Sequence, residues 1–542
     1  MTSRNLIKNI VVLLLLAAIV FSLVSCQQKK ITSATESGLR IGIEIEPERL
    51  NPLTAKNPQT FIVLMQIFEG LLGLDENGRV IPVIAESWET KDNGQTWLFH
   101  IRKNALFHES EIFGTQKTRN IDANDAAWSF TAICGPGTYA SFVLADVIQG
   151  CADYGAGKAE VVDGIKVVDQ YTLQFSLVKP EKFFPNRLTT GWMAILPKEL
   201  EAPRNKDKWG LSMAVGSGPY ELVSNTDSEV VLAANENYWD KQRIPKIKKL
   251  IYKVIKNDQL RYAELQKGGI DILLITTALL PTFMDGARKP KDEILKKFEV
   301  KETATFNTQF IGLNLNMMKD ANLRRAMYFG VDRKLIAEKL LYGYADVTGG
   351  TIPPGINGYK PPFEIDQLFN QSKAREELSK SKYKGEEIEL LIHDQAGSEQ
   401  IGQIFQDQMG SIGIKIKLTK LDMNGVIGRI LKGDAPAFSM YMDYVFSSAE
   451  PILLNLFPSS KRPIPNFWQY SNPDVDQALE GLRTLEHAAS IARAAEIEAQ
   501  IMNDVPAIFL FRQTNLFAHN KRLHNLQVNG HGHVMFERAT LQ

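Results

Sequence analysis

The apolar run from Ile10 to Phe21 sets the first limit on what this chain can fold into. Its twelve residues are too few to span about 30 Å of hydrocarbon. Arg4 and Lys8 precede it, and no acidic residue does. A positive start followed by a short apolar core is typical of a secretory signal peptide. We therefore expect residues 1–25 to be a signal peptide and the rest of the chain to fold outside the cytoplasm.

Cys26 comes shortly after this run, preceded by Leu23, Val24 and Ser25. These four residues resemble the bacterial lipobox, in which the cysteine is lipidated and becomes the new N-terminus. Residues 26–38 would then be a lipidated cysteine and a flexible tether that reaches roughly 20 Å from the membrane. An ordinary signal peptide with an incidental cysteine is the alternative. We expect an exported, lipid-anchored protein that faces the periplasm, or the exterior of a single-membrane bacterium.

The charge balance argues against a nucleic-acid partner. The sequence holds 62 basic and 62 acidic residues, so removal of Arg4 and Lys8 leaves 60 against 62, a net charge of −2. Nucleic-acid binding usually calls for a concentrated basic face. The helix-turn-helix spacing around Gly330 and Asp332 therefore predicts two ordinary helices, the first ended by Gly330 and the second capped by Asp332.

Cys134 and Cys151 lie 17 residues apart. A disulfide can persist in an exported chain, and the chain-entropy model gives such a loop about 3 kcal/mol of stabilisation. We expect a disulfide between these two residues; two buried free thiols are the alternative.

Strand and helix signals follow one another from Leu39 to the C-terminus without a repeat or a low-complexity tract. Leu39 to Glu46 alternates apolar and polar residues, as a half-buried strand does. Residues 61–72 have the apolar spacing of a helix, and the Ala-rich stretch 478–502 predicts another packed helix. The pattern predicts a mixed α/β fold.

No familiar catalytic or metal-binding motif is complete. The stretch VGSGPY around Ser217 lacks the spacing of a nucleophile elbow. His108, in FHESEI, lacks the second histidine that a zinc protease carries four residues later. His524, His531 and His533 match no familiar metal site, so we expect them to be surface histidines. We predict no enzymatic activity, no metal and no cofactor; an exported hydrolase remains the alternative.

The stretch from Pro82 to His108, PVIAESWETKDNGQTWLFHIRKNALFH, resembles the signature block of bacterial extracellular solute-binding proteins of family 5. That family includes oligopeptide- and dipeptide-binding receptors of ABC importers. The block predicts two strands around the turn Asp92-Asn93-Gly94. More stretches resemble the family in the same order along the chain: IDANDAAWSF, VVDQYTLQFSLVKP, VGSGPYELV, NENYWDKQRIPKIKKLIYKVI, YAELQKGGIDIL, FIGLNLNMMKDANLRRAMYFGVDRKLI, DQMGSIGIKIKLTKLD and YSNPDVDQAL. The resemblance runs from about Leu39 to Gln542.

This resemblance implies a two-lobe, three-domain periplasmic-binding-protein fold of type II, with the ligand cleft between the lobes. Domain I would comprise residues 39–81, 193–302 and 506–542. Domain II, residues 82–192, would be inserted into domain I and share its lobe. Domain III, residues 303–505, would form the other lobe.

The resemblance also implies a function. Such a receptor captures a solute between its lobes and delivers it unchanged to the permease subunits of an ABC importer. We expect short peptides as the solute and a monomeric receptor. Another solute in the same fold, such as a sugar or a metal chelate, is an alternative, and so is a sensor or chaperone without a transporter.

The stretch SMYMDYVFSSAEPILLNLF resembles the family segment that carries the peptide anchor. In peptide receptors an aspartate at this place receives the α-ammonium of the ligand, and the matching residue is Asp443. Tyr441, Met442 and Tyr444 would line the same site. The segment has Met440 where the family pattern has tryptophan. The alternative for Asp443 is a turn cap or an ion pair with a nearby base.

Overall fold

The computed structural model describes residues 38–542, with the exception of residues 48, 57, 287, 304, 395, 396 and 530. The expected signal peptide, Cys26 and nearly all of the expected tether lie outside these described residues. Among the helices of the described part, each is too short or too polar to cross a membrane.

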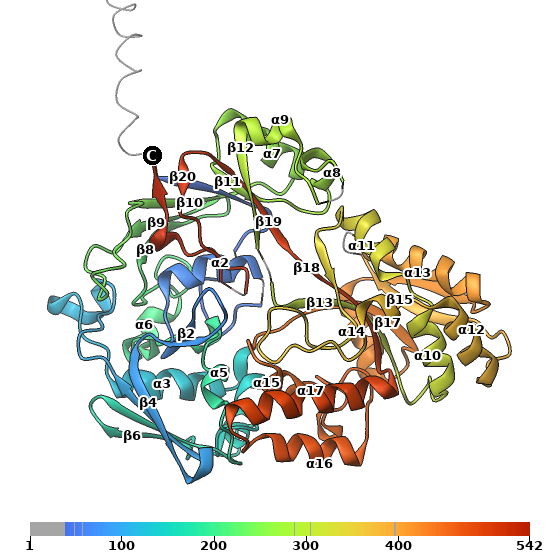
Figure 1. Cartoon of the computed structure of the whole chain (residues 1–542). Coiled ribbons are helices and arrows are strands. Elements are labelled where there is room, and N and C mark those ends of the chain that lie inside the picture. Colours follow the sequence, from blue (N-terminus) through green and yellow to red (C-terminus); the bar gives the residue numbers. More distant parts are fainter. Residues whose placement is uncertain are drawn as a thin grey trace, which may run out of the picture.

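The first domain is built on a seven-stranded sheet with the order β12-β19-β11-β1-β10-β9-β8, seen in the left and upper part of Figure 1. The predicted strand at Leu39 is present as β1, which pairs in parallel with both β10 and β11 and has buried apolar residues. The elements of this domain are β1 (Leu39–Ile43), α2 (Pro58–Ile67), β2 (Leu72–Leu74), β3 (Val80–Pro82), α6 (Pro203–Lys206), β8 (Tyr220–Asn225), β9 (Glu229–Ala234), β10 (Lys249–Val254), α7 (Asp258–Lys267), β11 (Ile272–Leu274), α8 (Leu280–Phe283), α9 (Asp292–Lys297), β12 (Phe298–Thr303), β19 (Asn515–Asn520), β20 (Leu523–His524) and β21 (Thr540–Leu541).

The helix predicted over residues 61–72 is displaced toward the N-terminus. The observed α2 ends at Ile67, and Leu72 already belongs to β2, which pairs with β3. Gly70 lies between them, and a side chain there would come within 2.9 Å of the Met193 carbonyl oxygen. Gly70 also forms an antiparallel bridge with Ala194, so the residues after α2 pair with other extended segments instead of continuing the helix.

The second domain is inserted into the first and holds a four-stranded sheet with the order β4-β5-β7-β6. The predicted turn at Asp92-Asn93-Gly94 joins β4 to β5, and all three residues have positive φ angles. The elements are β4 (Ala85–Lys91), β5 (Thr96–Ile101), α3 (Ala123–Cys134), α4 (Cys151–Gly155), β6 (Ile165–Asp169), β7 (Thr172–Ser176) and α5 (Phe184–Arg187). A disulfide joins Cys134 to Cys151, with Cα atoms 5.1 Å apart, so it ties the end of α3 to the start of α4.

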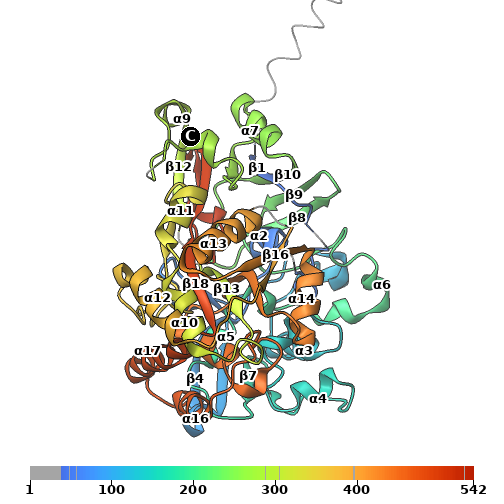
Figure 2. The same cartoon turned by 90° about the vertical axis from the view of Figure 1, so that its right-hand side faces the viewer.

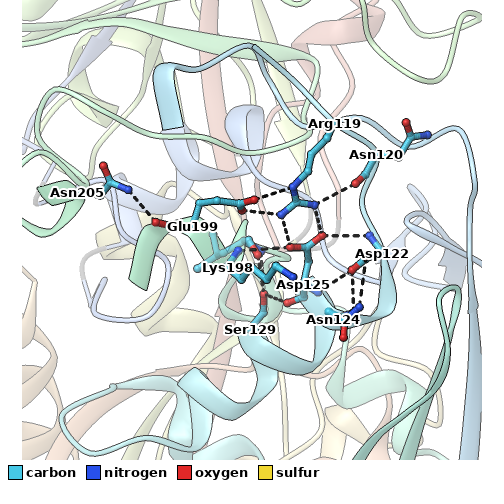
Figure 3. Close-up of polar contacts among 10 residues, drawn as sticks. Arg119, Asn120, Asp122, Asn124, Asp125, Ser129, Lys198, Glu199 and Asn205 are labelled. Atoms are coloured by element: carbon cyan, nitrogen blue, oxygen red, sulfur yellow. Dashed lines mark hydrogen bonds and ion pairs between the residues drawn. The ribbon is translucent and has the colours of Figure 1, made fainter. Parts of the chain in front are cut away.

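Arg119 fastens this second domain to the chain that returns to the first (Figure 3). Its guanidinium donates hydrogen bonds to the carboxylates of Asp125 on α3 and Glu199, at 2.6 Å each for the shortest contacts. Asp125 also forms a capping box with Asp122 at the start of α3. Ser129 accepts a hydrogen bond from the Leu196 amide at 2.8 Å. These polar groups are paired with one another, so the cluster is structural.

The third domain is built on a six-stranded sheet with the order β14-β18-β13-β17-β15-β16. Figure 2 looks onto this domain and shows α11 and α13 in front of β13 and β18. The elements are β13 (Asn307–Leu313), α10 (Ala321–Phe329), α11 (Arg333–Leu341), β14 (Ala345–Val347), α12 (Gln371–Lys380), β15 (Ile388–His393), α13 (Ser398–Ile412), β16 (Ile416–Leu421), α14 (Met423–Lys432), β17 (Ala437–Asp443), α15 (Ala449–Leu456), α16 (Pro473–Leu482), α17 (His487–Asp504) and β18 (Ala507–Gln513).

The predicted helix caps in this domain are confirmed. Gly330 follows the last residue of α10, and the Asp332 side chain accepts a hydrogen bond from the Leu335 amide at the start of α11. The single helix predicted over 478–502 is wrong, because α16 ends at Leu482 and α17 begins at His487.

The domains form two lobes, and two segments of the chain connect one lobe to the other (Figure 1). The first lobe holds the first and second domains, and the second lobe is the third domain. One connection runs from β12 to β13, and the other passes through Thr514 between β18 and β19. Since β18 pairs with β13 and β14 in the six-stranded sheet, the return to the first domain comes at Thr514, later than the expected border between residues 505 and 506.

Candidate ligand-binding site

The end of β17 brings Asp443 to the junction of the two lobes. In the antiparallel pairing of β17 with β13, Asp443 lies opposite Asn307, the first residue of β13. The Tyr444 amide then donates a hydrogen bond to the Phe306 carbonyl at 2.6 Å. Because β13 begins where the chain enters the second lobe, the last residue of β17 lies beside a connection between the lobes.

Asp443 is an exposed residue, and its carboxylate has no hydrogen bond or ion pair within the described part of the chain. Burial by the surrounding protein nevertheless raises the pKa of Asp443 to about 6. Both properties are expected of a carboxylate on the wall of a cleft, which water reaches from one side only. Neither the turn cap nor the ion pair considered for Asp443 is present among these residues. The carboxylate can therefore accept a cationic group.

The neighbours of Asp443 divide between the two faces of β17. Side chains alternate along a strand, so Tyr441 lies on the face of Asp443, and it is 41% exposed. Burial and the charge of Asp443 raise the pKa of Tyr441 to about 12. Met442 is half-buried on the other face. Tyr444 is only 5% exposed, and its hydroxyl donates to the Thr351 carbonyl at 2.7 Å. The Tyr444 hydroxyl is therefore paired inside the second lobe, and its contact with ligand stays a prediction.

Two histidines that were expected at the surface lie at the lobe junction. His531 and His533 are half-buried, and burial lowers their pKa values to about 3 and about 4. His531 packs edge-on against Phe306 at 5.2 Å and hydrogen-bonds the Tyr444 backbone. No local sequence signal predicts this burial, because it depends on where the C-terminal segment returns in space. Within the described residues, no group of three or more His, Cys, Asp or Glu side chains could hold a metal ion.

The FHESEI and VGSGPY stretches meet in a structural contact in the first lobe. His108 contacts the Gly218 carbonyl through Nε2 at 2.9 Å and accepts a hydrogen bond from the Gly216 amide at Nδ1, at 3.3 Å. Burial lowers the pKa of His108 to about 4, so the ring is neutral at physiological pH. Ser217 donates to the Glu69 carboxylate at 3.0 Å. The histidine and the serine therefore hold a loop in place.

A cavity of about 410 Å³ lies between the second domain and the second lobe. Its volume falls within the range of about 300–1,000 Å³ that ligand pockets occupy. Asp443 does not line the cavity, but Phe446 links the two places: its ring lies 5.4 Å from the Arg187 guanidinium, and Arg187 pairs with Glu181 on the cavity wall. The lining residues are Asp146, Val147, Val178, Lys179, Glu181, Leu454, Pro458, Ser460, Lys461, Asp476, Leu479, Glu480 and Arg483.

Two lobes, two connections between them, a cavity at their interface and the exposed Asp443 carboxylate at their junction define a two-lobe binding protein. The comparison with known families agrees. The chain belongs to the bacterial extracellular solute-binding proteins of family 5, since the model of the middle region of that family matches residues 79–463.

Two relatives of known name match this chain over most of its length. The dipeptide-binding protein of Escherichia coli strain K12 is 24% identical over 524 residues, which cover 92% of this chain and 94% of that protein. The heme-binding protein A of Haemophilus influenzae is 26% identical over 437 residues, which cover 77% of this chain and 76% of that protein.

Solved structures confirm the predicted two-lobe fold. HbpA2 from Haemophilus parasuis has a TM-score of 0.77 at 21% identity, over 93% of this chain and all of that one. The periplasmic binding protein DppA from Helicobacter pylori, in complex with the peptide STSA, has a TM-score of 0.75 at 18% identity, over 93% of this chain and 98% of that one.

Proposed function

We propose that this protein is the solute receptor of an ABC importer, that it captures short peptides between its lobes, and that it delivers them unchanged to the permease subunits. Family membership and the names of the relatives support this function. The single observation that carries it is the Asp443 carboxylate, which is open to solvent, partly desolvated and unpaired among the described residues. The receptor acts as a monomer and uses neither catalysis nor a cofactor.

Asp443 receives the α-ammonium of the peptide. A charge-assisted hydrogen bond of this kind contributes about 1.5–3 kcal/mol. The bond is stronger when closure of the lobes excludes water from it. The exposed end of β17 around Tyr441 offers backbone groups to which an extended peptide can pair as an added strand. Main-chain pairing gives affinity with little dependence on peptide side chains. Because the ligand contacts both lobes only when they are closed, binding favours the closed state.

The Asp443→Asn variant tests the anchor. Titration calorimetry with short peptides is expected to show an affinity at least about tenfold lower than that of the wild type, because the amide carries no charge. The wild-type protein is expected to bind free peptides more tightly than N-acetylated ones, and the variant to lose that preference. Asp407→Asn, an exposed position on α13, is the matched control and is expected to bind as the wild type does. Equal affinity of the wild type for both forms of peptide would refute the anchor.

Native mass spectrometry of the protein purified from its host tests the solute class. A bound peptide of a few residues is the expected result. A bound sugar, metal chelate or other non-peptide solute would contradict the peptide assignment and leave the receptor function standing. Conversion of the solute during incubation would contradict the receptor function itself.

We also propose that Cys26 is lipidated and holds the receptor at a bacterial membrane, facing the periplasm or the cell exterior. The four-residue lipobox resemblance supports this anchor. Cys26→Ala is expected to move the protein from the membrane fraction to the soluble fraction, while Ser33→Ala in the same tether leaves it at the membrane. Unchanged membrane attachment of Cys26→Ala would refute the lipid anchor.

A further inference from the structure

Glu181 of the first lobe lies between two arginines that come from different lobes. Its side chain is 1% exposed. Arg187, six residues later in the same domain, pairs with it from one side. Arg483, which follows α16 in the second lobe, donates from Nη1 to Glu181 Oε2 at 2.7 Å. One buried carboxylate therefore joins the lobes.

The backbone fixes Glu181 in this position. The Glu181 amide donates to the Gly94 carbonyl at 3.0 Å. Gly94 has a φ of +96°, and a Cβ there would lie 3.1 Å from the Glu181 carbonyl carbon. The next amide, of Lys182, donates across the interface to the Arg483 carbonyl at 2.9 Å. Main chain and side chain of Arg483 are thus both held by adjacent residues of the first lobe.

Three further ion pairs surround this contact, and each joins opposite charges of the two lobes. They are Asp146 with Lys461, Lys182 with Glu486, and Lys179 with Glu480, the last at 3.0 Å. Lys179 and Glu480 are 53% and 49% exposed, and exposed pairs of this kind contribute little. Glu181 differs from Lys179 and Glu480, at the exposed rim of the interface, because its side chain is buried away from water. Its pairing with Arg483 is therefore screened less by water and salt than the exposed pairs are.

We propose that Glu181 is a positioning residue that closes the two lobes through Arg483 whether or not a solute is bound. When the lobes separate, Glu181 keeps Arg187, which belongs to its own lobe, and loses only Arg483. The Glu181–Arg483 contact consequently exists in the closed state alone and shifts the equilibrium toward that state. Both residues line the 410 Å³ cavity, so the contact closes one wall of the cavity.

This inference deepens the proposed receptor function and adds a consequence for affinity. A contact that favours the closed state without touching a specific chemical group of the solute changes the affinity for every solute by the same factor. Truncation of one partner of a buried charge pair acts mainly on dissociation. Loss of Arg483 is therefore expected to accelerate solute release and to leave association nearly unchanged.

The first test measures closure without any solute. Spin labels are placed on cysteines introduced at Val168 on β6 and Glu496 on α17, which are exposed and belong to different lobes. Cys26→Ser in the same full chain prevents labelling there. Double electron–electron resonance of the solute-free protein is expected to show a short-distance, closed population that falls severalfold in Arg483→Met. This variant leaves Glu181 paired with Arg187, so each lobe keeps its own buried charges paired.

Three variants control this result. Glu181→Gln removes the charge from the other side and is expected to reduce the closed population as well, which keeps the test decisive if Arg483→Met folds poorly. Arg483→Lys is expected to restore part of the closed population. Lys179→Met removes only an exposed rim pair and is expected to have less than about a twofold effect. Identical distance distributions in the wild type, Arg483→Met and Glu181→Gln would overturn the proposal.

The second test measures release of bound peptide by stopped flow. Arg483→Met is expected to dissociate about tenfold faster for peptides of different sequence, with association changed less than about twofold. A loss confined to one peptide would overturn the proposed role, since it would mean a direct contact with that peptide. If no peptide binds while the solute-free distances change as expected, the peptide assignment fails and the role of Glu181 stands.

Discussion

Asp443 lies opposite Asn307 where β17 ends and β13 begins, at the junction of the lobes. The Asp443 carboxylate is consequently positioned by the strand pairing of the second lobe and lies next to a connection to the first. Under the proposed function, a solute bound there would meet both lobes when they close, and the ionisation of Asp443 would control how strongly the solute is held.

Peptide affinity is expected to fall in mild acid. The pKa of Asp443 in the empty protein is about 6 because burial disfavours the charged form. The peptide ammonium requires the ionised carboxylate, so affinity is expected to be highest near pH 7 and to decrease below pH 6, approaching tenfold for each pH unit. Calorimetry between about pH 4.5 and 7.5 measures this dependence. N-acetylated peptides serve as the control, and equal pH dependence for both ligands would contradict the assignment.

The empty Asp443→Asn variant is expected to melt at a slightly higher temperature than the wild type at pH 7.5. The pKa of Asp443 is raised on folding, so the ionised side chain disfavours the folded state above pH 6, and protonation removes this effect as the pH falls toward 4. The two proteins should therefore melt alike near pH 4. Thermal unfolding at both pH values checks the prediction, with Asp407→Asn as the control. A lower melting temperature of Asp443→Asn at pH 7.5 would mean that the carboxylate stabilises the empty protein.

Local features of the fold could be predicted from the sequence. Asp332 caps α11 through an amide three residues away, and the Asp92-Asn93-Gly94 turn requires only the backbone preferences of its own residues. The two-lobe architecture followed from the family resemblance, whose ordered motifs cover the chain.

Features that depend on distant partners could not be predicted. β18 belongs to the second lobe because it pairs with β13, a strand almost two hundred residues earlier in the chain. The burial of His531 depends on Phe306 and Tyr444. The placement of Tyr441 on the face of Asp443 and of Met442 on the other face could have been inferred from alternation along β17.

The disulfide is expected to stabilise the second domain by about 3 kcal/mol. It closes a loop of 17 residues and so lowers the conformational entropy of the unfolded chain. Replacement of both Cys134 and Cys151 by Ala should lower the free energy of unfolding by that amount. Denaturant unfolding of the double variant measures the change, and Cys26→Ser controls for loss of a cysteine elsewhere. Unfolding at the same denaturant concentration as the wild type would contradict the prediction. Peptide affinity should not change, since both cysteines lie away from β17.

Stability is also expected to depend on Glu498 of α17. Its carboxyl accepts a hydrogen bond from the Ile352 amide at 2.8 Å, and burial raises its pKa to about 8. An unfolded glutamate has a pKa of about 4.3, so between these values the folded protein binds a proton that the unfolded chain releases. Folding stability is therefore expected to fall as the pH rises from about 4.3 to 8, by as much as about 1.4 kcal/mol per pH unit, and to level off above pH 8.

Glu498→Gln imitates the protonated side chain and should remove this dependence. Urea unfolding is expected to give similar stabilities for the variant and the wild type near pH 4, and a more stable variant near pH 9, where the wild-type carboxylate is ionised in its buried position. Glu496→Gln, exposed on the same helix, is the control and should follow the wild type at both pH values. A constant difference between Glu498→Gln and the wild type across this range would show that Glu498 titrates alike in the folded and unfolded chains, and that its buried carboxyl is ionised at neutral pH.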